Sequence, residues 1–152
     1  MKKSTFENMA EKAFLGLEAK FGFKKIETKF EHRTVLVRFQ NETTAVLLNY
    51  EIGNTPWLEI ADLQDPQKKT TLGWLLVEQG LEKTPTPEQA FKPTPLAESE
   101  LSGVLQKMTG QVLETGADLL KGDFSRLPAL QTRARKYDQE CKRYLSIHKP
   151  KA

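Results

Sequence analysis

The sequence predicts a single α+β domain, and three observations support this class. Four short runs within residues 25–63 are apolar at every second position or apolar throughout, as strands of an antiparallel sheet are. Residues 5–20 and the stretch after residue 95 instead repeat apolar side chains every three or four positions, which is typical of amphipathic helices. The length of 152 residues suits one domain. We therefore expect residues 1–152 to fold together, with helices packed on one face of a meander sheet.

The first predicted element is an amphipathic helix over residues 5–20. Ser4 or Thr5 is a suitable N-cap, because a hydroxyl can accept a hydrogen bond from the free amides of the first turn. Gly22 is expected to end the helix and to turn the chain into the first strand. The apolar side chains of this helix recur at helical spacing: Phe6, Met9, Ala10, Ala13, Phe14 and Leu17.

Four strands are predicted next, and they form an antiparallel meander because the turns between them are short. The third run is apolar on both faces through Ala45–Leu48, which indicates a central strand. Phe30, Phe39 and Ile26 lie at alternating strand positions, so we expect them in the core. The four predicted strands are residues 25–32, 34–40, 44–52 and 57–63.

A polar loop over residues 64–69 is predicted to lead into a short apolar helix at 72–77. Thr70 or Thr71 is the expected cap, and Gly80 is the expected stop.

Residues 82–95 hold four prolines, which disfavour both helix and strand. We expect a crossing loop there, anchored by Leu81 and Phe91.

Two further helices are predicted to close the chain. Thr94-Pro95 is a strong helix start, and the apolar pattern continues to Gly122. Gly103, Gly110 and Gly116 interrupt this helix, which indicates a kink or the close approach of another backbone. The last helix is expected to begin with a cap at Asp123 or Ser125. Residues 148–152 are expected to be a flexible tail.

Bulk properties favour a cytoplasmic protein. No apolar run approaches the roughly 18 residues of a transmembrane helix, so no membrane partner is expected. Glu7 and Glu11 interrupt the apolar stretch that an export signal would need. Cys141 is the single cysteine, which excludes an internal disulfide and a multi-cysteine zinc site and indicates a reducing compartment.

The net charge of +3 is unevenly distributed. Residues 124–152 carry eight lysines and arginines against two acidic residues, so the rest of the chain is net negative. Within the last helix, Arg133, Lys136 and Arg143 share one face, and Arg135 and Lys142 form a second row. Such rows suit an acidic protein, a nucleic acid or plain solvation of a helix face, and protein contact is favoured over nucleic acid.

Catalytic signatures are sparse. His32 and His148 lack the spacing of metal ligands, and Cys141 lies on the apolar seam of the last helix. We therefore expect no metal and no cofactor. A second candidate patch surrounds the turn at residues 53–56, where Tyr50, Glu51, Trp57 and Glu59 lie. Glu51 and Glu59 flank this turn and are candidates for an acid–base pair or for a cross-strand ion pair.

The order of elements resembles that of small bacterial cytosolic α+β proteins, including immunity proteins of polymorphic toxin systems. The segments that carry this resemblance are Tyr50–Leu63, Thr71–Val77 and Leu119–Asp123. The resemblance implies a stoichiometric inhibitor that acts by surface complementarity. The positive net charge makes a nuclease a less expected target.

We therefore expect a non-enzymatic protein-binding module, of an inhibitor or accessory type. A nucleic-acid-associated module that uses the basic last helix is the alternative. An enzyme is the third candidate, with Tyr50, Glu51 and Glu59 as its first residues to test. The sequence leaves the oligomeric state open.

Overall fold

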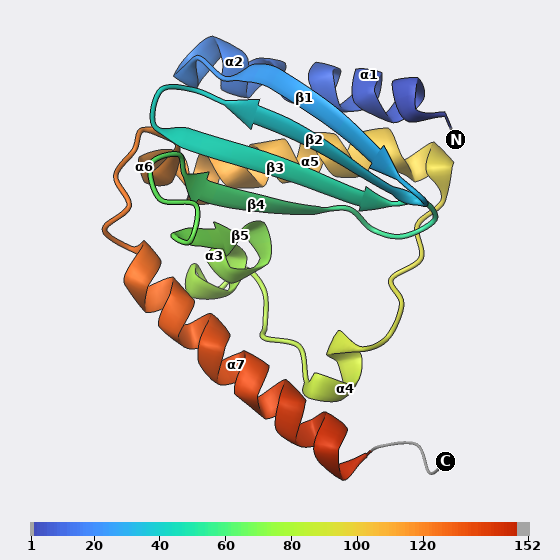
Figure 1. Ribbon diagram of the computed structural model, residues 1–152, viewed down its shortest axis with the longest axis vertical. Coiled ribbons are helices and arrows are strands. Elements are labelled where there is room, and N and C mark those ends of the chain that lie inside the picture. Colours follow the sequence, from blue (N-terminus) through green and yellow to red (C-terminus); the bar gives the residue numbers. More distant parts are fainter. Residues whose placement is uncertain (1, 149–152) are drawn as a thin grey trace.

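A computed structural model describes residues 2–148, so residues 149–152 of the expected tail lie outside the described part. The α+β class and the antiparallel meander predicted from the sequence are both confirmed (Figure 1). Helices near both ends of the chain cover one face of the sheet, and a long final helix extends away from it (Figure 1).

The sheet has five strands rather than the four predicted, and their order follows the chain. The additional strand β5 pairs with β4 along residues that the sequence assigned to a loop and a helix cap. Three residues are too short a run to show a period of two, so no sequence signal marks it. The strands are β1 (Lys24–Glu31), β2 (Thr34–Gln40), β3 (Thr44–Glu51), β4 (Trp57–Asp62) and β5 (Lys69–Thr71).

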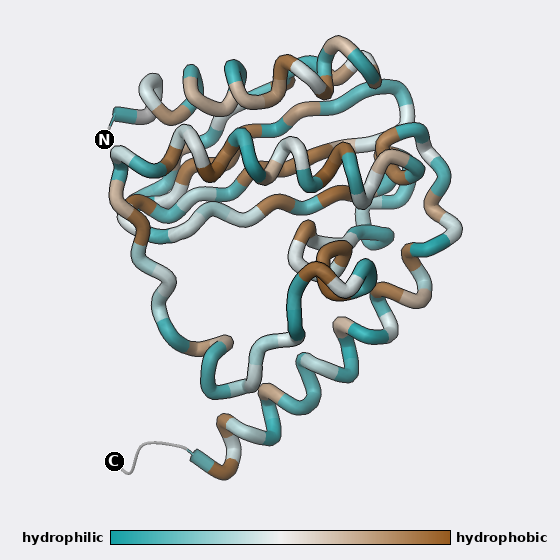
Figure 2. The backbone as a smooth tube through the Cα atoms, turned by 180° about the vertical axis from the view of Figure 1, so that it is seen from behind, coloured by the Kyte–Doolittle hydropathy of each residue, from teal (hydrophilic) through white to brown (hydrophobic). Residues whose placement is uncertain are grey.

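The core lies between the sheet and two helices, α1 (Lys3–Ala13) and α5 (Glu98–Thr115). Figure 2, seen from behind, shows α5 crossing the strands. The ring of Phe6 stacks on that of Tyr50 with centroids 4.6 Å apart. Buried side chains of three neighbouring strands complete this face: Val35, Val37, Phe39, Val46, Leu48, Leu58 and Ile60.

The prediction that Ile26 and Phe30 belong to the core is wrong. Ile26 is 50% exposed and Phe30 is 44% exposed, whereas Phe39 is buried as predicted. The reason is the position of β1 at the edge of the sheet, where only β2 flanks it. The register also shifts between Lys25 and Glu27, so Ile26 sits in a bulge.

The predicted N-terminal helix is divided into α1 and α2 (Leu15–Phe21) at Phe14. The Phe14 ring is buried against Phe39, with ring centroids 4.4 Å apart. The helix starts earlier than expected, because Lys2 and not Ser4 or Thr5 is the N-cap residue. Gly22 ends α2 as predicted, in the left-handed conformation that suits glycine.

Helix α3 (Leu72–Glu78) forms where the sequence predicts it, and the Thr71 hydroxyl accepts a hydrogen bond from Trp74 N at 3.4 Å. Residues 79–97, which we call the strap, connect α3 to α5. The strap is not free of helix as predicted, because Thr86 and Gln89 form a capping box that starts the one-turn helix α4 (Pro87–Ala90).

The expected anchors of the strap, Leu81 and Phe91, are 55% and 48% exposed, so neither is buried as an anchor would be.

Helix α5 starts at Glu98 rather than at Pro95, because Pro95 forms a β-bridge with Asn54. It stops before Gly116, and α6 (Ala117–Leu120) follows. A Cβ atom on Gly116 would lie 3.2 Å from Leu75 Cδ1, so a side chain and not another backbone approaches this glycine, where the predicted helix is interrupted. A Cβ atom added to Gly103 or Gly110 would have no neighbour within 4 Å among the described residues, so no other backbone approaches these two glycines closely.

Helix α7 (Leu127–Ile147) does not lie on the covered face of the sheet with α5 as expected. It packs along β5 and α3 and then reaches α4 (Figure 1). Its chain is largely hydrophilic in colour in Figure 2, and its buried residues are Leu127, Leu130 and Cys141.

A candidate binding groove under the strap

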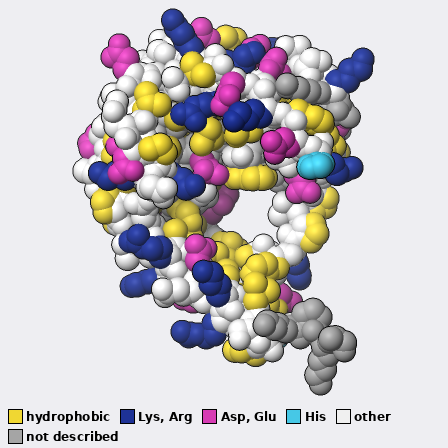
Figure 3. Space-filling model, viewed as in Figure 1, with side chains coloured by type: hydrophobic (Ala, Val, Ile, Leu, Met, Phe, Trp, Pro, Cys, Tyr) yellow, Lys and Arg dark blue, Asp and Glu magenta, His cyan; other side chains and the backbone are white. Residues whose placement is uncertain are grey.

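The molecule is hollowed between the sheet and α7 (Figure 3). Two adjoining cavities open there, and both are lined by Thr71, Gly73 and Glu82. We call the two cavities together the groove. Its walls come from the start of β4, from α3, from α5, from α7 and from the strap, so five separate segments of the chain build it.

The larger cavity has a volume of about 430 Å³ and lies between β4, α3 and α5. Trp57 stands at its mouth with 43% of its surface exposed, while Met108 is almost fully buried in its wall. Leu72 and Leu76 of α3 and Val104 of α5 continue the apolar lining. Apolar walls with few polar groups are typical of sites that bind by shape and by burial of nonpolar surface.

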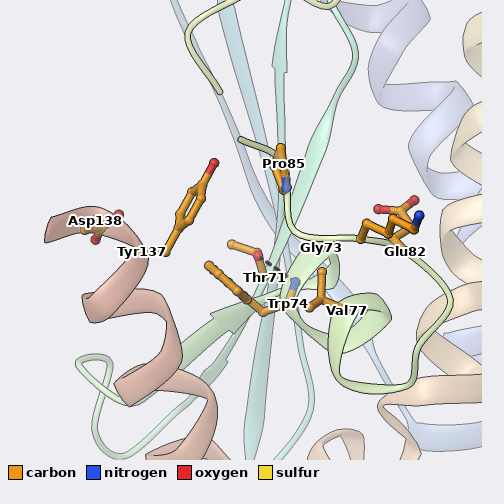
Figure 4. Close-up of a pocket in the computed structure, with 9 residues that line it drawn as sticks. Thr71, Gly73, Trp74, Val77, Glu82, Pro85, Tyr137 and Asp138 are labelled. Atoms are coloured by element: carbon orange, nitrogen blue, oxygen red, sulfur yellow. Dashed lines mark hydrogen bonds between the residues drawn. The ribbon is translucent and has the colours of Figure 1, made fainter. Parts of the chain in front are cut away.

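The smaller cavity, of about 290 Å³, lies between α3, the strap and α7. Figure 4 shows Trp74 and Tyr137 side by side at one wall of it, with Pro85 of the strap at another wall and Asp138 pointing away from Trp74. The two aromatic rings meet edge to face, with centroids 5.5 Å apart and planes at 77°. This geometry is favourable for aromatic pairs and holds both rings at the cavity wall.

The Tyr137 hydroxyl is the chemically most informative group of the groove. Its oxygen is buried and has no hydrogen-bond partner among the described residues. Burial raises the pKa of Tyr137 to about 12, and the neighbouring Cys141 adds to the shift. The hydroxyl therefore keeps its proton over the whole physiological range and offers a hydrogen-bond donor beside the smaller cavity.

The strap is fastened at one end by backbone hydrogen bonds. Thr55 N donates to Thr94 O at 2.8 Å, and Leu96 N donates to Gly53 O at 3.0 Å. Further back, Phe91 stacks on Tyr144 of α7 with ring centroids 6.2 Å apart. Nearer to α3, Leu81 N donates to Leu76 O at 2.9 Å, while the side chains of residues 81–85 are exposed.

Charged groups lie only at the rims of the groove. Glu82 and Lys107 border the larger cavity, and Lys83 and Asp138 border the smaller one. All four residues are exposed. Within residues 2–148, no three His, Cys, Asp or Glu side chains come together in a way that could hold a metal ion.

The structure separates the predicted patch of Tyr50, Glu51, Trp57 and Glu59. Tyr50 is buried on the helix-covered face, and its hydroxyl accepts a hydrogen bond from Gly53 N at 3.3 Å. Trp57 and Glu59 point to the opposite face of the sheet, and Trp57 also lines the larger cavity at the start of β4.

Glu51 and Glu59 are not neighbours across the hairpin. Glu59 pairs with Leu47, four residues from Glu51, which is about 13 Å along a strand. Glu59 instead forms an ion pair with Lys69 of β5, at 3.9 Å.

The five basic residues predicted as a binding face all lie exposed on α7, and none of them lines the groove. No ion pair involves them among the described residues, and Arg135 donates only to the Thr132 hydroxyl, at 3.3 Å. We call these residues the basic face of α7: Arg133, Arg135, Lys136, Lys142 and Arg143.

Sequence reasoning missed Trp74, Met108 and Tyr137 as groove residues. Each follows the apolar pattern of its helix and was therefore expected to serve packing alone. The sequence holds one signal for Tyr137. Along the apolar stripe of α7, the residues change from leucine at positions 127 and 130 to tyrosine at positions 137 and 144. Tyrosine is frequent where one end of a side chain is buried and the other end meets a polar group.

Comparisons of the chain with protein-family models, with curated proteins and with solved structures gave no match. No helix within residues 2–148 combines the length and the apolar character that crossing a membrane requires.

Proposed function

We propose that this protein is a non-enzymatic protein-binding module that takes a segment of its partner into the groove. The observation that carries the proposal is the pair of adjoining, largely apolar cavities beside which the Tyr137 hydroxyl lies buried without a partner among the described residues. An inhibitor or accessory role of the kind that the sequence resemblance implies is consistent with such a site.

The chemistry of the groove defines the segment that would bind. Trp57, Met108 and Leu76 offer nonpolar surface, so the segment contributes apolar side chains. The neutral Tyr137 hydroxyl is a donor, and a backbone carbonyl is the matching acceptor that every peptide supplies. Glu82 and Lys107 at the rim have opposite charges, so they favour a segment without a large net charge.

Gly73 provides a direct test, because it lines both cavities and is exposed. The nearest atom to a Cβ at this position is Thr71 Oγ1 at 3.7 Å, so a larger side chain fits without strain and extends into the groove. Gly73→Leu should therefore block binding without removing a native contact. Gly103→Leu is the matched control, since Gly103 is also an exposed helical glycine but lines neither cavity.

The measurement is a peptide-display selection on the full chain, followed by titration of the selected peptides. We expect apolar peptides whose dissociation constant rises about tenfold or more with Gly73→Leu and stays unchanged with Gly103→Leu. Trp57→Ala should weaken the same peptides, whereas Phe91→Ala, at an exposed aromatic outside the groove, should not. Selected peptides that bind Gly73→Leu as well as the unchanged chain would contradict the proposal.

A nucleic-acid-associated function remains the second candidate, because one specific observation favours it. The basic face of α7 presents five exposed cations that form no ion pair within residues 2–148. Rows of unpaired lysine and arginine are what contact with a phosphate backbone requires. The two candidates are distinguishable, since none of these five cations lines the groove.

A further inference from the structure

The outer edge of β1 carries more exposed nonpolar surface than an edge strand normally shows. Ile26 and Phe30 are 50% and 44% exposed, and Leu15, which is 57% exposed, lines a hollow together with Lys24 and Lys25. Within the described residues, β1 pairs with β2 alone, so its other side keeps unpaired amides and carbonyls. Such an edge is a template for pairing with another strand.

The alternation of backbone hydrogen bonds shows which residues of β1 face outward. Arg33 O accepts a hydrogen bond from Ile52 N at 2.9 Å, so the backbone groups of Arg33 point toward the β3 side. Successive residues of a strand direct their backbone groups to opposite sides, so those of Thr34 point toward β1. Thr34 pairs with Glu31, which places the backbone groups of Glu31, Lys29 and Glu27 on the β2 side. The amides and carbonyls of Thr28 and Phe30 therefore point away from the sheet, toward the free edge.

The order of side chains along this edge is complementary to itself. An antiparallel partner with the same sequence, related by a two-fold axis at Thr28, places Glu27 opposite Lys29 and Lys29 opposite Glu27. Both residues lie on the same face of β1, where they now form an ion pair at 3.8 Å within the strand. The same register places Ile26 opposite Phe30, so the two exposed apolar side chains cover each other.

Thr28 occupies the axis of this arrangement. Its Oγ1 atom is buried and has no hydrogen-bond partner among residues 2–148. Two threonines directly across from each other can form a hydrogen bond between their hydroxyls. The backbone groups of Thr28 that point outward can pair with those of the second Thr28 in the same register.

We infer that β1 is a homodimerisation edge, which pairs antiparallel with β1 of a second copy around Thr28. A strand of arbitrary sequence meets a bulge and alternating charges there, which oppose pairing. A second copy meets opposite charges and apolar partners at each position. The edge lies at the other end of the sheet from β5 and the groove, so the inference does not depend on the proposed function.

The decisive experiment uses sedimentation velocity over a concentration series with the single variants Glu27→Lys and Lys29→Glu. Each variant sets like charges opposite each other twice, so the dimer dissociation constant should rise about tenfold or more. An equimolar mixture of the two variants should restore a dimer, because the first variant carries a lysine at both positions and the second carries a glutamate at both. Opposite charges then face each other across the whole contact. Restoration in the mixture also shows that both variants are folded.

A cross-linking measurement supplies an independent readout. In a Cys141→Ser background, Thr28→Cys should form an intermolecular disulfide under mild oxidation, because the two Cα atoms of a hydrogen-bonded pair lie about 5.5 Å apart. Thr132→Cys, at an exposed threonine on α7, is the control and should not cross-link. A chain that stays monomeric up to its solubility limit would overturn the inference. A dimer that neither charge variant weakens would do the same.

Discussion

Arg126 and Asp118 join the start of α7 to α6 through a bidentate pair. Arg126 Nε donates to Asp118 Oδ2 at 2.8 Å, and Arg126 Nη2 donates to Asp118 Oδ1 at 2.6 Å. The same guanidinium also contacts Glu78 of α3 and donates to Thr115 O at 2.6 Å. One side chain thus ties the start of α7 to α3, α5 and α6.

We expect Arg126→Ala to lower the free energy of unfolding by about 1–3 kcal/mol, because the Glu78 and Asp118 carboxylates lose a partly buried partner. Arg126→Lys should lower the free energy of unfolding by a smaller amount, since an ammonium group keeps the charge but cannot form the bidentate contact. Urea unfolding of the full chain measures both. Equal stability of Arg126→Ala and the unchanged protein would show that the network contributes nothing.

Gly122 has a positive φ of 92°, and a Cβ atom there would lie 2.8 Å from Thr43 Cβ. Gly122→Ala should therefore destabilise the protein by about 1–3 kcal/mol, through strain and through a clash at the β2–β3 turn. Gly103→Ala is the opposite control, since the helical position is open and alanine is about 1 kcal/mol better than glycine there. Thermal unfolding should shift down for the first variant and up for the second.

Tyr137 should ionise only in strongly alkaline solution, since burial raises its pKa to about 12. A raised pKa means that folding favours the protonated phenol. This contribution to stability is complete below pH 10 and is lost as the pH rises from about 10 to 12. Absorbance titration of tyrosinate should show a component near pH 12 that Tyr137→Phe removes.

Tyr137→Phe also has an effect at neutral pH that separates structure from function. The hydroxyl makes no hydrogen bond among the described residues, so its removal should change the free energy of unfolding by less than about 1 kcal/mol, or should raise it. Binding of a groove peptide should weaken, because the donor is lost. Loss of stability without loss of binding would mean that the hydroxyl serves the fold.

Reversal of the basic face by Arg133→Glu, Lys136→Glu and Arg143→Glu should leave peptide binding in the groove unchanged. These side chains are exposed on α7, and none of them lines the groove. Titration of a fluorescent DNA or RNA duplex at low salt tests the other candidate function. Affinity that falls steeply with salt and disappears in the triple variant would favour nucleic acid.

Features with a local cause could be predicted from the sequence. Thr71 caps α3 as expected, and β3 is central as the apolar residues on both its faces indicate. The exposure of Ile26 and Phe30 had no such local signal, because their alternation is the same in an edge strand and in a central one. Only the position of β1 in the sheet decides their burial, and that position depends on the whole fold.

The groove could not be predicted because its parts are distant in the chain. Trp74 and Tyr137 meet only because α7 runs along α3 instead of joining α5 on the sheet. Arg126 fastens the start of α7 there, because its partners Glu78 and Asp118 lie in two other helices. A charged residue just before a helix gives no sequence signal of which distant carboxylates it will contact.

The meander order has a kinetic consequence. Each strand pairs with the next along the chain, and the turns after β1 and β2 are short, so closing each hairpin costs little loop entropy. The sheet can therefore form from any hairpin by adding the adjacent strand, and its strand pairing does not require segments that are distant in the sequence to meet. We therefore expect rapid formation of the strands, followed by slower docking of α7, whose contacts with β5 and α3 span about half of the polypeptide.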